Sequence, residues 1–452
     1  MNRLIYRLLR LSHVLKRWLG QQLTPNGIVL LVGLFIFGLI GLDIKRSLSY
    51  QMFIFLLAIF AVSILFSRLS RYRLTAVRKL PRLGTVGVPL SYPVLVSNRR
   101  GKSLQGLALR ECLPAARTFP SFQAFRRAMM RDSWRMRKRS AGSSREDWFR
   151  LLSRYRRMVA PAIALPPLAA KSEIKVTGEI LPLRRGLLRL QTLTLACPDP
   201  LGLVNRCVSF SQPQSVLILP KRYQLPVIDL PGSRRHQADS SALGASIGDS
   251  QEFRSLREYR PGDSPRKIHW KSWAKLGKPV IREEQTEFSV RHTLILDTFQ
   301  ADDYSDVLEE AVAIAASLSC TVQTQESLLD TVFVSGQAHC FTVGHGQGQT
   351  QQLLELLASV VPCQDQPFES LLTVVKSRLS MVSGCICVLL DWDSDRKALI
   401  EQLQAANIPT LVLIVSAESG LTETPERSCL KNSQSSLHVL TLDEIQEGLL
   451  RL

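Results

Sequence analysis

The stretch HTLILD, residues His292–Asp297, decides the fold of the C-terminal part of the chain. Its apolar residues run continuously instead of alternating, which is typical of a strand buried on both faces of a parallel sheet. The segment Ser305–Leu318 follows, and its apolar residues recur with the period of an amphipathic helix. A buried strand, an acid and a helix in this order predict an α/β unit.

The same alternation continues to the C-terminus. We expect further strands at Leu328–Val334, His339–Val343, Gly384–Asp391, Pro409–Val415 and Leu437–Leu442, with helices at Gln349–Val361, Ser394–Ala406 and Asp443–Leu450. Such a pattern predicts a doubly wound, mostly parallel sheet. Two strands end in an acid, Asp297 and Asp391, and residues at the carboxyl ends of such strands line a crevice where ligands bind.

A dense run of charged and aromatic residues precedes this unit. It reads SQEFRSLREYRPGDSPRKIHWKSWAKLGKPVIREEQTE over residues 250–287, and this composition is not that of a packed core. It resembles the signature of the DUF58 family, membrane-associated bacterial proteins of undefined activity. From this resemblance we take as candidate partner-binding residues Arg257, Glu258, Tyr259, Pro261, Gly262, Asp263, Arg266, His269, Trp270 and Lys271.

The signature has a structural and a functional interpretation. In the structural one, Pro261–Asp263 forms a turn, acids and arginines cross-link it, and Trp270 and Trp273 pack beneath. In the functional one, the arginines and lysines bind an acidic partner. We expect a mixture, in which Glu258 and Asp263 hold the loop while basic residues such as Arg257, Arg266 and Lys271 meet the partner.

The unit after the signature resembles a von Willebrand factor A domain, which the DUF58 family often carries. The metal site of that fold begins with D-x-S-x-S, whereas this chain reads Asp297-Thr-Phe-Gln-Ala301. Phe299 and Ala301 replace two hydroxyl ligands, and Mg²⁺ prefers a complete set of oxygens. We therefore expect a degenerate metal site at Asp297 and Asp391, with no bound metal and no cofactor.

Two apolar runs near the N-terminus, Gly27–Leu42 and Met52–Phe66, contain no charged residue. Each approaches the ~20 residues of a bilayer crossing once its flanks are included. Arginines and lysines precede the first run and follow the second, so the positive-inside rule places both termini in the cytoplasm. The sequence thus predicts a transmembrane helical hairpin and a multi-pass membrane protein, and the DUF58 resemblance implies the bacterial plasma (inner) membrane.

Residues 1–22 alternate leucines with basic residues, which is typical of an amphipathic helix on the cytoplasmic leaflet; a solvated helix is the alternative. Residues 68–225 contain short apolar segments broken by proline and glycine and predict a β-sandwich-like domain. Asp199–Leu203 also resembles the DUF58 pattern. The insert 115–158 combines many arginines with aromatic residues. It fits contact with the membrane surface, a solvated loop or nucleic-acid binding.

Composition limits the class of function. The chain has 452 residues and a net charge of +19, which calls for an anionic partner. Nine cysteines without a CxxC pair indicate buried thiols in a reducing compartment. P-loop and HExxH motifs are absent from the sequence, and we assign no catalytic residue.

These observations predict an α/β protein with a membrane anchor. We divide it into an amphipathic segment (1–22), two transmembrane helices (23–67), a β-rich domain (68–225), the signature region (226–290) and a von Willebrand factor A-like domain (291–452). The resemblance implies a non-enzymatic adaptor that works with a MoxR-type AAA+ ATPase and contacts anionic membrane lipids. The alternatives are a hydrolase using Asp297 and Asp391, or, less favoured, a membrane anchor that binds nucleic acid through the insert 115–158.

Overall fold

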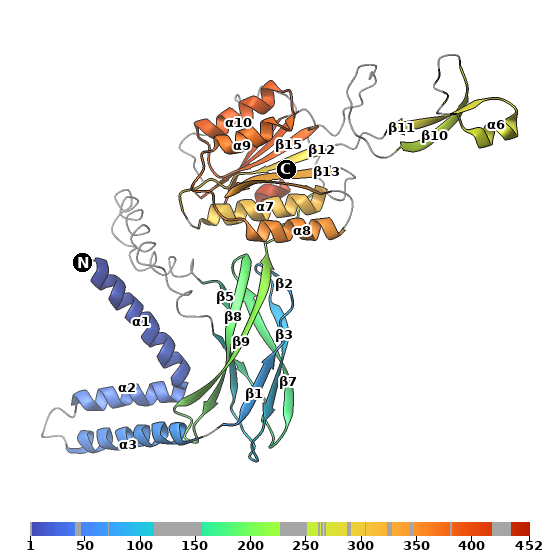
Figure 1. Cartoon of the computed structure of the whole chain (residues 1–452). Coiled ribbons are helices and arrows are strands. Elements are labelled where there is room, and N and C mark those ends of the chain that lie inside the picture. Colours follow the sequence, from blue (N-terminus) through green and yellow to red (C-terminus); the bar gives the residue numbers. More distant parts are fainter. Residues whose placement is uncertain are drawn as a thin grey trace. The chain divides into compact units, whose positions relative to one another are not determined.

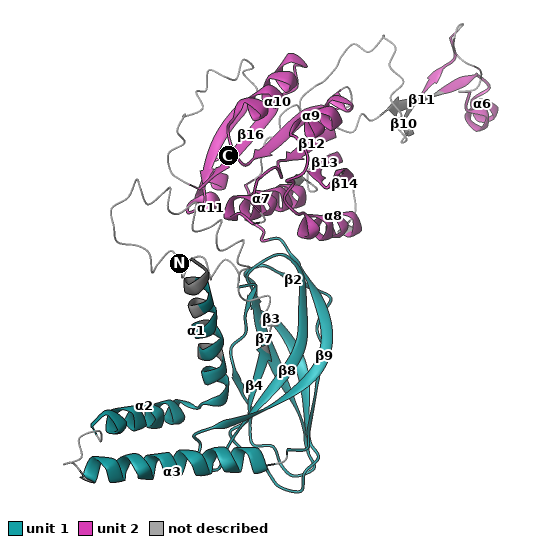
Figure 2. Ribbon diagram, turned by 60° about the vertical axis from the view of Figure 1, so that its left-hand side comes forward, with its two compact units in different colours: residues 1–220 teal, residues 221–452 magenta. Residues whose placement is uncertain are grey.

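The computed structural model describes residues 2–40, 47–70, 72–112, 156–226, 251–260, 263, 265, 268–286, 291–302, 304–322, 328–343, 347–379, 382–417 and 435–452. The chain divides into two compact units, Met1–Pro220 and Lys221–Leu452 (Figure 2). Most of the arginine-rich insert lies outside the described residues, as do Pro261, Gly262 and Arg266 of the signature.

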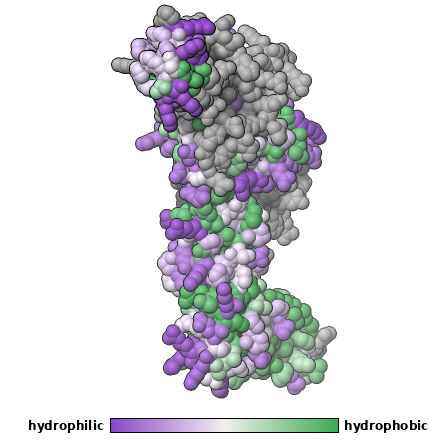
Figure 3. Space-filling view, turned by 90° about the vertical axis from the view of Figure 1, so that its right-hand side faces the viewer, coloured by the Kyte–Doolittle hydropathy of each residue, from purple (hydrophilic) through white to green (hydrophobic). Residues whose placement is uncertain are grey.

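The first unit begins with three helices, α1 (Asn2–Gln22), α2 (Pro25–Ile40) and α3 (Ser47–Leu69). Among the described helices, one is long and apolar enough to cross a membrane, the α3 segment Leu48–Leu69; α2 is apolar but shorter. The pair is antiparallel, because Gly33 faces Leu56 and Gly38 faces Phe53. Apolar residues gather at the foot of the space-filling view, at the height of these helices (Figure 3).

The rest of the first unit is two sheets around one core (Figure 1). One has the order β1-β3-β7-β5 and the other β2-β9-β8-β4-β6. Their strands are β1 (Leu74–Arg78), β2 (Leu83–Thr85), β3 (Leu90–Asn98), β4 (Ala108–Cys112), β5 (Met158–Val159), β6 (Ile163–Ala164), β7 (Glu173–Pro182), β8 (Gly186–Pro198) and β9 (Asn205–Leu219). Alternate residues such as Val94, Val96, Leu193 and Leu195 point inward and are fully buried.

Proline does not end β9, contrary to the sequence-based expectation. Pro213 lies where the β8–β9 register shifts, at a bulge that needs no amide hydrogen at that position. The carbonyls of Leu190 and Gln212 near this bulge accept hydrogen bonds from the buried guanidinium of Arg78, at 3.3 and 2.7 Å. Glu111 completes the network at 2.6 Å from Arg78 Nη1, so the buried charge is paired.

The second unit contains a six-stranded sheet in the order β14-β13-β12-β15-β16-β17, parallel except for β14. The strands are β12 (Arg291–Leu296), β13 (Leu328–Ser335), β14 (Gln337–Val343), β15 (Gly384–Leu389), β16 (Thr410–Ser416) and β17 (Ser436–Thr441). Helices α7 (Asp306–Val322), α8 (Gln347–Ser359), α9 (Glu369–Lys376), α10 (Ser394–Ala405) and α11 (Ile445–Leu450) accompany it, with α7 and α8 on one face and α9 and α10 on the other (Figure 1). The mixed α/β architecture follows the predicted order, with α9 as an addition.

The signature region forms a hairpin of its own. Strands β10 (Gln251–Glu258) and β11 (Val280–Thr286) pair antiparallel, and the short helix α6 (Trp270–Leu276) lies between them in the chain. The sequence predicted a turn here but not the strands, because charged residues interrupt any alternation of apolar and polar positions. A two-stranded sheet is marginally stable by itself, so local contacts must hold this region together.

Candidate functional site

The turn that follows β10 is closed by an ion pair between Arg257 and Asp263. Two parallel hydrogen bonds of 2.7 Å join the guanidinium nitrogens Nη1 and Nη2 to the two carboxylate oxygens. The carboxylate also accepts the Arg260 amide hydrogen at 2.9 Å. The pKa of Asp263 is lowered to about 2, mainly by the hydrogen bond from Arg257 and to a smaller extent by that from the Arg260 amide. Asp263 therefore holds the loop in its ionised form, as expected from the sequence.

The contacts of Glu258 do not fit the role expected of it. Glu258 does not hold the loop: 74% of its side chain is exposed, and it pairs with the exposed Lys278 at 3.4 Å. Exposed ion pairs of this kind contribute little to stability. The expectation that Arg257 meets a partner stays a prediction; within the chain its guanidinium pairs with Asp263. The lock is thus Arg257 with Asp263, six residues apart.

Trp270 also differs from the expectation that it packs beneath the turn. It is 65% exposed and stacks on Trp273, with ring centroids 5.2 Å apart and planes at 21°. Leu276 is 62% exposed, and the lysines Lys271 and Lys275 of the same helix are exposed as well. We call the residues Trp270, Lys271, Lys275 and Leu276 the hairpin patch. It combines basic groups with an exposed tryptophan, a residue type enriched among binding hot spots.

Helix α6 is bonded to β11 at its N-terminal end, and a glycine cap closes its C-terminal end, so the hairpin patch lies on an ordered helix. The His269 amide donates to the Val280 carbonyl at 2.9 Å, and His269 Nδ1 lies 2.7 Å from Ser272 Oγ. Gly277 ends the helix with φ +68° and donates to the Trp273 carbonyl. Tyr259 belongs to the same framework, since its amide donates to Pro279 at 2.9 Å. His269 and Tyr259 therefore act as positioning residues.

The second candidate site is the end of β12, where Asp297 is fully buried. Its carboxylate accepts hydrogen bonds from Arg396 Nε at 2.6 Å, from the Phe299 amide at 2.9 Å and from the Leu390 amide at 3.1 Å. Arg396 comes from the first turn of α10, whose N-cap Asp393 accepts the Arg396 amide at 3.0 Å and also pairs with its guanidinium. The sequence had not indicated either Arg396 or Asp393.

The Arg396 guanidinium is satisfied on every side. Its Nη2 donates to the Phe299 carbonyl at 3.1 Å, and its carbon lies 5.1 Å from the centre of the Phe368 ring. Burial raises the pKa of Asp297, an effect that the Arg396 charge opposes. Burial alone would lower the pKa of Arg396, but the carboxylates of Asp297 and Asp393 raise it. The geometry is that of a closed, buried ion pair.

These residues do not fit the metal site of a von Willebrand factor A domain. Phe299 packs edge-on against Phe368, with centroids 5.2 Å apart, and the Thr298 hydroxyl donates to the Val334 carbonyl. Asp391 is exposed and accepts the amide hydrogen of its neighbour Trp392. In the described part of the chain, no group of three or more His, Cys, Asp or Glu residues could hold a metal. A guanidinium cation lies beside Asp297 instead.

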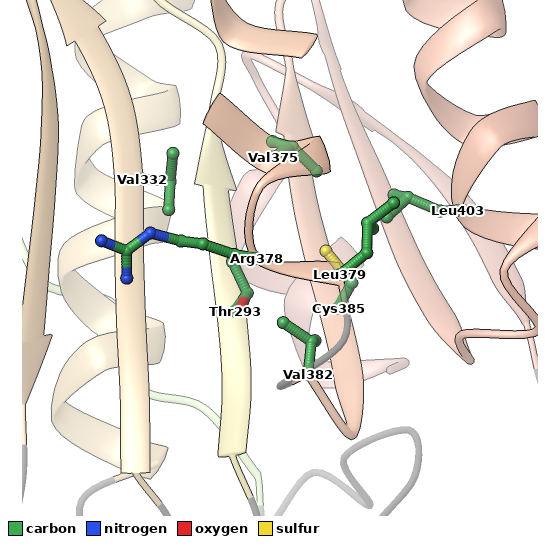
Figure 4. Close-up of a pocket in the computed structure, with 8 residues that line it drawn as sticks. All are labelled: Thr293, Val332, Val375, Arg378, Leu379, Val382, Cys385 and Leu403. Atoms are coloured by element: carbon green, nitrogen blue, oxygen red, sulfur yellow. The ribbon is translucent and has the colours of Figure 1, made fainter. Parts of the chain in front are cut away.

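A narrow pocket lies near the opposite ends of β12 and β15 (Figure 4). It is lined by Thr293, Val332, Val375, Arg378, Leu379, Val382, Cys385 and Leu403. Most of these side chains are apolar, and the buried Thr293 hydroxyl has no hydrogen-bond partner among the described residues. The lining includes no pair of groups suited to proton transfer or nucleophilic attack, so the pocket offers no catalytic arrangement.

Comparison with known proteins identifies the region that holds both candidate sites. A family model described as "Protein of unknown function DUF58" matches residues 255–400, from β10 through the first part of α10. The uncharacterized protein YeaD of Bacillus subtilis (strain 168) is 23% identical over 192 residues, which cover 42% of this chain and 46% of that protein. The match thus spans less than half of the relative's length.

Solved structures resemble the chain only weakly. The CARDB domain of a Pyrococcus furiosus protein is 15% identical with a TM-score of 0.17, and it covers 32% of this chain and 93% of that domain. A GH20 exo-β-N-acetylglucosaminidase from Vibrio harveyi is 9% identical with a TM-score of 0.14, covering 77% of this chain and 58% of that enzyme. TM-scores this low do not establish a shared fold.

Proposed function

We propose that the chain is a membrane-anchored, cytoplasm-facing interaction module of the DUF58 type. The observation that carries this proposal is that one set of residues in the signature hairpin is paired internally while another set is exposed. Arg257 and Asp263 lock the turn, whereas the hairpin patch exposes an indole, an aliphatic side chain and two ammonium groups. Such a surface fits an acidic protein partner with an apolar pocket for Trp270.

The membrane part of the proposal rests on α2 and α3. Together they form an antiparallel apolar pair, and the outer side chains, such as Val29, Phe35, Phe55 and Leu65, are exposed. We propose that both helices cross the bacterial plasma membrane. The basic residues outside the pair then place both termini in the cytoplasm, and α1 contacts anionic lipids.

For the second unit we propose a doubly wound, von Willebrand factor A-like domain that works without a divalent cation. The strand order and the helices on both faces support the first part, and the Arg396–Asp297 pair supports the second. A hydrolase using Asp297 and Asp391 is disfavoured, because Asp297 is buried against a guanidinium and Asp391 faces solvent. Nucleic-acid binding through the insert stays a prediction, since residues 113–155 lie outside the described part.

The proposed partner is a MoxR-type AAA+ ATPase, which the family resemblance implies. Full-length protein in detergent would be used to recover the purified ATPase. The double variant Trp270→Ala, Lys271→Ala should lower recovery at least tenfold, since truncation of a central aromatic anchor costs about 2 kcal/mol or more. Lys278→Ala, which removes another exposed charge of the same hairpin, is the control and should recover the ATPase normally. Equal recovery by the double variant would refute the proposal.

The proposed topology has a separate test. Reporter fusions at residues 1 and 452 should give cytoplasmic signals, and a fusion at residue 47 should give a signal outside the cytoplasm. A periplasmic signal from the C-terminal fusion would contradict the orientation, whatever the result of the ATPase experiment.

A further inference from the structure

The turn between β8 and β9 is built around a buried carboxylate. Asp199 is 5% exposed, and its Oδ1 accepts the amide hydrogens of Leu203 at 2.7 Å and Val204 at 2.9 Å. Oδ2 accepts the Leu201 amide at 3.2 Å and, from outside the turn, the hydroxyl of Ser63 at 2.7 Å. Ser63 lies in α3 and is fully buried. The turn thus has a polar contact within the apolar helix pair.

The same turn also forms hydrogen bonds with the residues at the start of α2. Thr24 is the residue before this helix, and its hydroxyl accepts the Gly27 amide at 3.1 Å. The Thr24 hydroxyl donates to the Gly202 carbonyl at 2.5 Å, and the Thr24 amide donates to the Leu203 carbonyl at 3.1 Å. One residue earlier, Leu23 forms a β-bridge with Val204. The first turn of α2 therefore shares its backbone hydrogen bonds with the sandwich.

Gly27 is required by this contact and not by the helix. A Cβ atom at Gly27 would lie 2.0 Å from the Leu203 carbonyl oxygen, which is impossible without movement. At Gly33 in the same helix, a Cβ atom would lie 3.7 Å from a Leu56 methyl group, an ordinary contact. Alanine favours a helix more than glycine does, so a loss of stability on Gly27→Ala would come from the close approach of the turn and not from the helix.

Two arginines of the sandwich bind the ends of the other helices. Arg206 Nη1 donates to the carbonyls of Ser67 at 2.8 Å and Arg68 at 2.7 Å, in the last turn of α3. Arg110 Nη1 donates to the Gly20 carbonyl of α1 at 2.7 Å. Cations at helix C-termini satisfy free carbonyls and complement the helix dipole. Leu23, Leu203 and Val204 add an apolar cluster with Leu19, Leu30, Ile59, Phe60 and Ile64.

From these contacts we infer that the turn Asp199–Val204 is a docking element that fixes the β-sandwich rigidly on the membrane helices. This inference depends on the proposed function in one respect, namely that α2 and α3 anchor the protein in the membrane. Ser63 precedes the end of α3 at Leu69 by six residues, which corresponds to about 9 Å of helix. In an apolar helix a buried hydroxyl needs a partner, and Asp199 supplies it. The sandwich and the helix pair therefore move as one body.

The test compares two glycine substitutions in the full-length protein in nanodiscs, followed by hydrogen exchange of peptides 19–30 and 199–206. Gly27→Ala should accelerate exchange in both peptides at least tenfold, because it forces the turn away from the helix. Gly33→Ala is the matched control and should leave both unchanged. The core strands β3 and β8 should stay protected in both variants, which shows that the sandwich remains folded.

Asp199→Ala separates docking from a purely local role of the carboxylate. Docking predicts faster exchange in peptide 19–30 as well as in the turn itself. If only the turn amides exchange faster, or if Gly27→Ala behaves like Gly33→Ala, the docking role is wrong. Membrane fractionation of the wild-type protein tests the anchor independently. If the protein is absent from the membrane fraction, the proposed anchor is wrong, while the exchange result still decides the docking role.

Discussion

Two arginine–aspartate pairs with similar closest distances lie in different surroundings. Arg257–Asp263 in the signature hairpin has side-chain exposures of 36% and 22%, with a closest N–O distance of 2.7 Å. Arg396–Asp297 in the α/β unit has exposures of 9% and 0%, with a distance of 2.6 Å. The first pair shapes a loop beside an exposed patch. The second pair lies buried at the end of β12, where the guanidinium of Arg396 occupies the space beside the Asp297 carboxylate.

The buried pair should show the largest effect. Arg396→Leu leaves the carboxylate of Asp297 buried without its countercharge, and loss of one partner of such a pair costs about 3–5 kcal/mol. The free energy of opening would be measured by hydrogen exchange of the β12 and β15 amides. Adding Asp297→Asn to Arg396→Leu should recover part of the loss, because the amide oxygen keeps one of the two backbone hydrogen bonds and the buried charge is removed. Equal stability of Arg396→Leu and wild type would contradict a closed ion pair.

A pH effect should also set the α/β unit apart from the hairpin. Burial lowers the pKa of His292 from 6.5 to about 4. The unfolded chain then binds a proton that the folded chain excludes, so this stability is complete above pH 6.5 and is lost as the pH falls toward 4. Between pH 7 and pH 5 the loss should be about 2 kcal/mol.

His292→Phe provides the control for this pH effect. The His292 side chain is 1% exposed, and phenylalanine at this position cannot bind a proton. The pH dependence of β12 amide exchange should therefore be weaker by the contribution assigned to His292. An unchanged pH dependence in this variant would show that His292 is not the group responsible.

The sequence predicted the α/β unit well because its strands are continuous apolar runs such as HTLILD. It did not predict β10 and β11, whose charged residues give no alternation, and it placed Glu258 in the lock that Asp263 forms with Arg257. The Arg396–Asp297 contact joins residues 99 positions apart. Spacing along the chain carries no signal for such a pair.

The hairpin lock should respond more modestly than the buried pair. Asp263→Ala removes the bidentate contact and the Arg260 amide bond, so exchange of the Arg260 amide should rise severalfold. Glu258→Ala should leave it nearly unchanged, because the Lys278 pair is exposed. Since the Asp263 pKa is lowered to about 2, the lock is complete above about pH 4 and is lost as the pH falls through 2. If Glu258→Ala accelerated exchange of the Arg260 amide more than Asp263→Ala does, Glu258 would hold the loop, as the sequence predicted.

Divalent cations should have the smallest effect of all. Ligand at a hundredfold excess over Kd stabilises a fold by about 2.7 kcal/mol, which would raise melting by several degrees. With Arg396 beside Asp297, and with Phe299 and Ala301 in place of hydroxyls, millimolar Mg²⁺ should leave the melting of the full-length protein unchanged. A rise of several degrees, abolished by Asp297→Asn, would show that the site binds a cation after all.

The most direct test of the contrast between the two regions is the affinity of the proposed ATPase partner for four forms of the full-length protein in nanodiscs. These are the wild type, the hairpin-patch variant Trp270→Ala with Lys271→Ala, the crevice variant Asp391→Ala and the hairpin control Lys278→Ala. The account predicts at least tenfold weaker binding for the hairpin-patch variant and wild-type affinity for the other two. Normal binding by the hairpin-patch variant together with loss of binding by Asp391→Ala would contradict it and place the partner surface at the crevice.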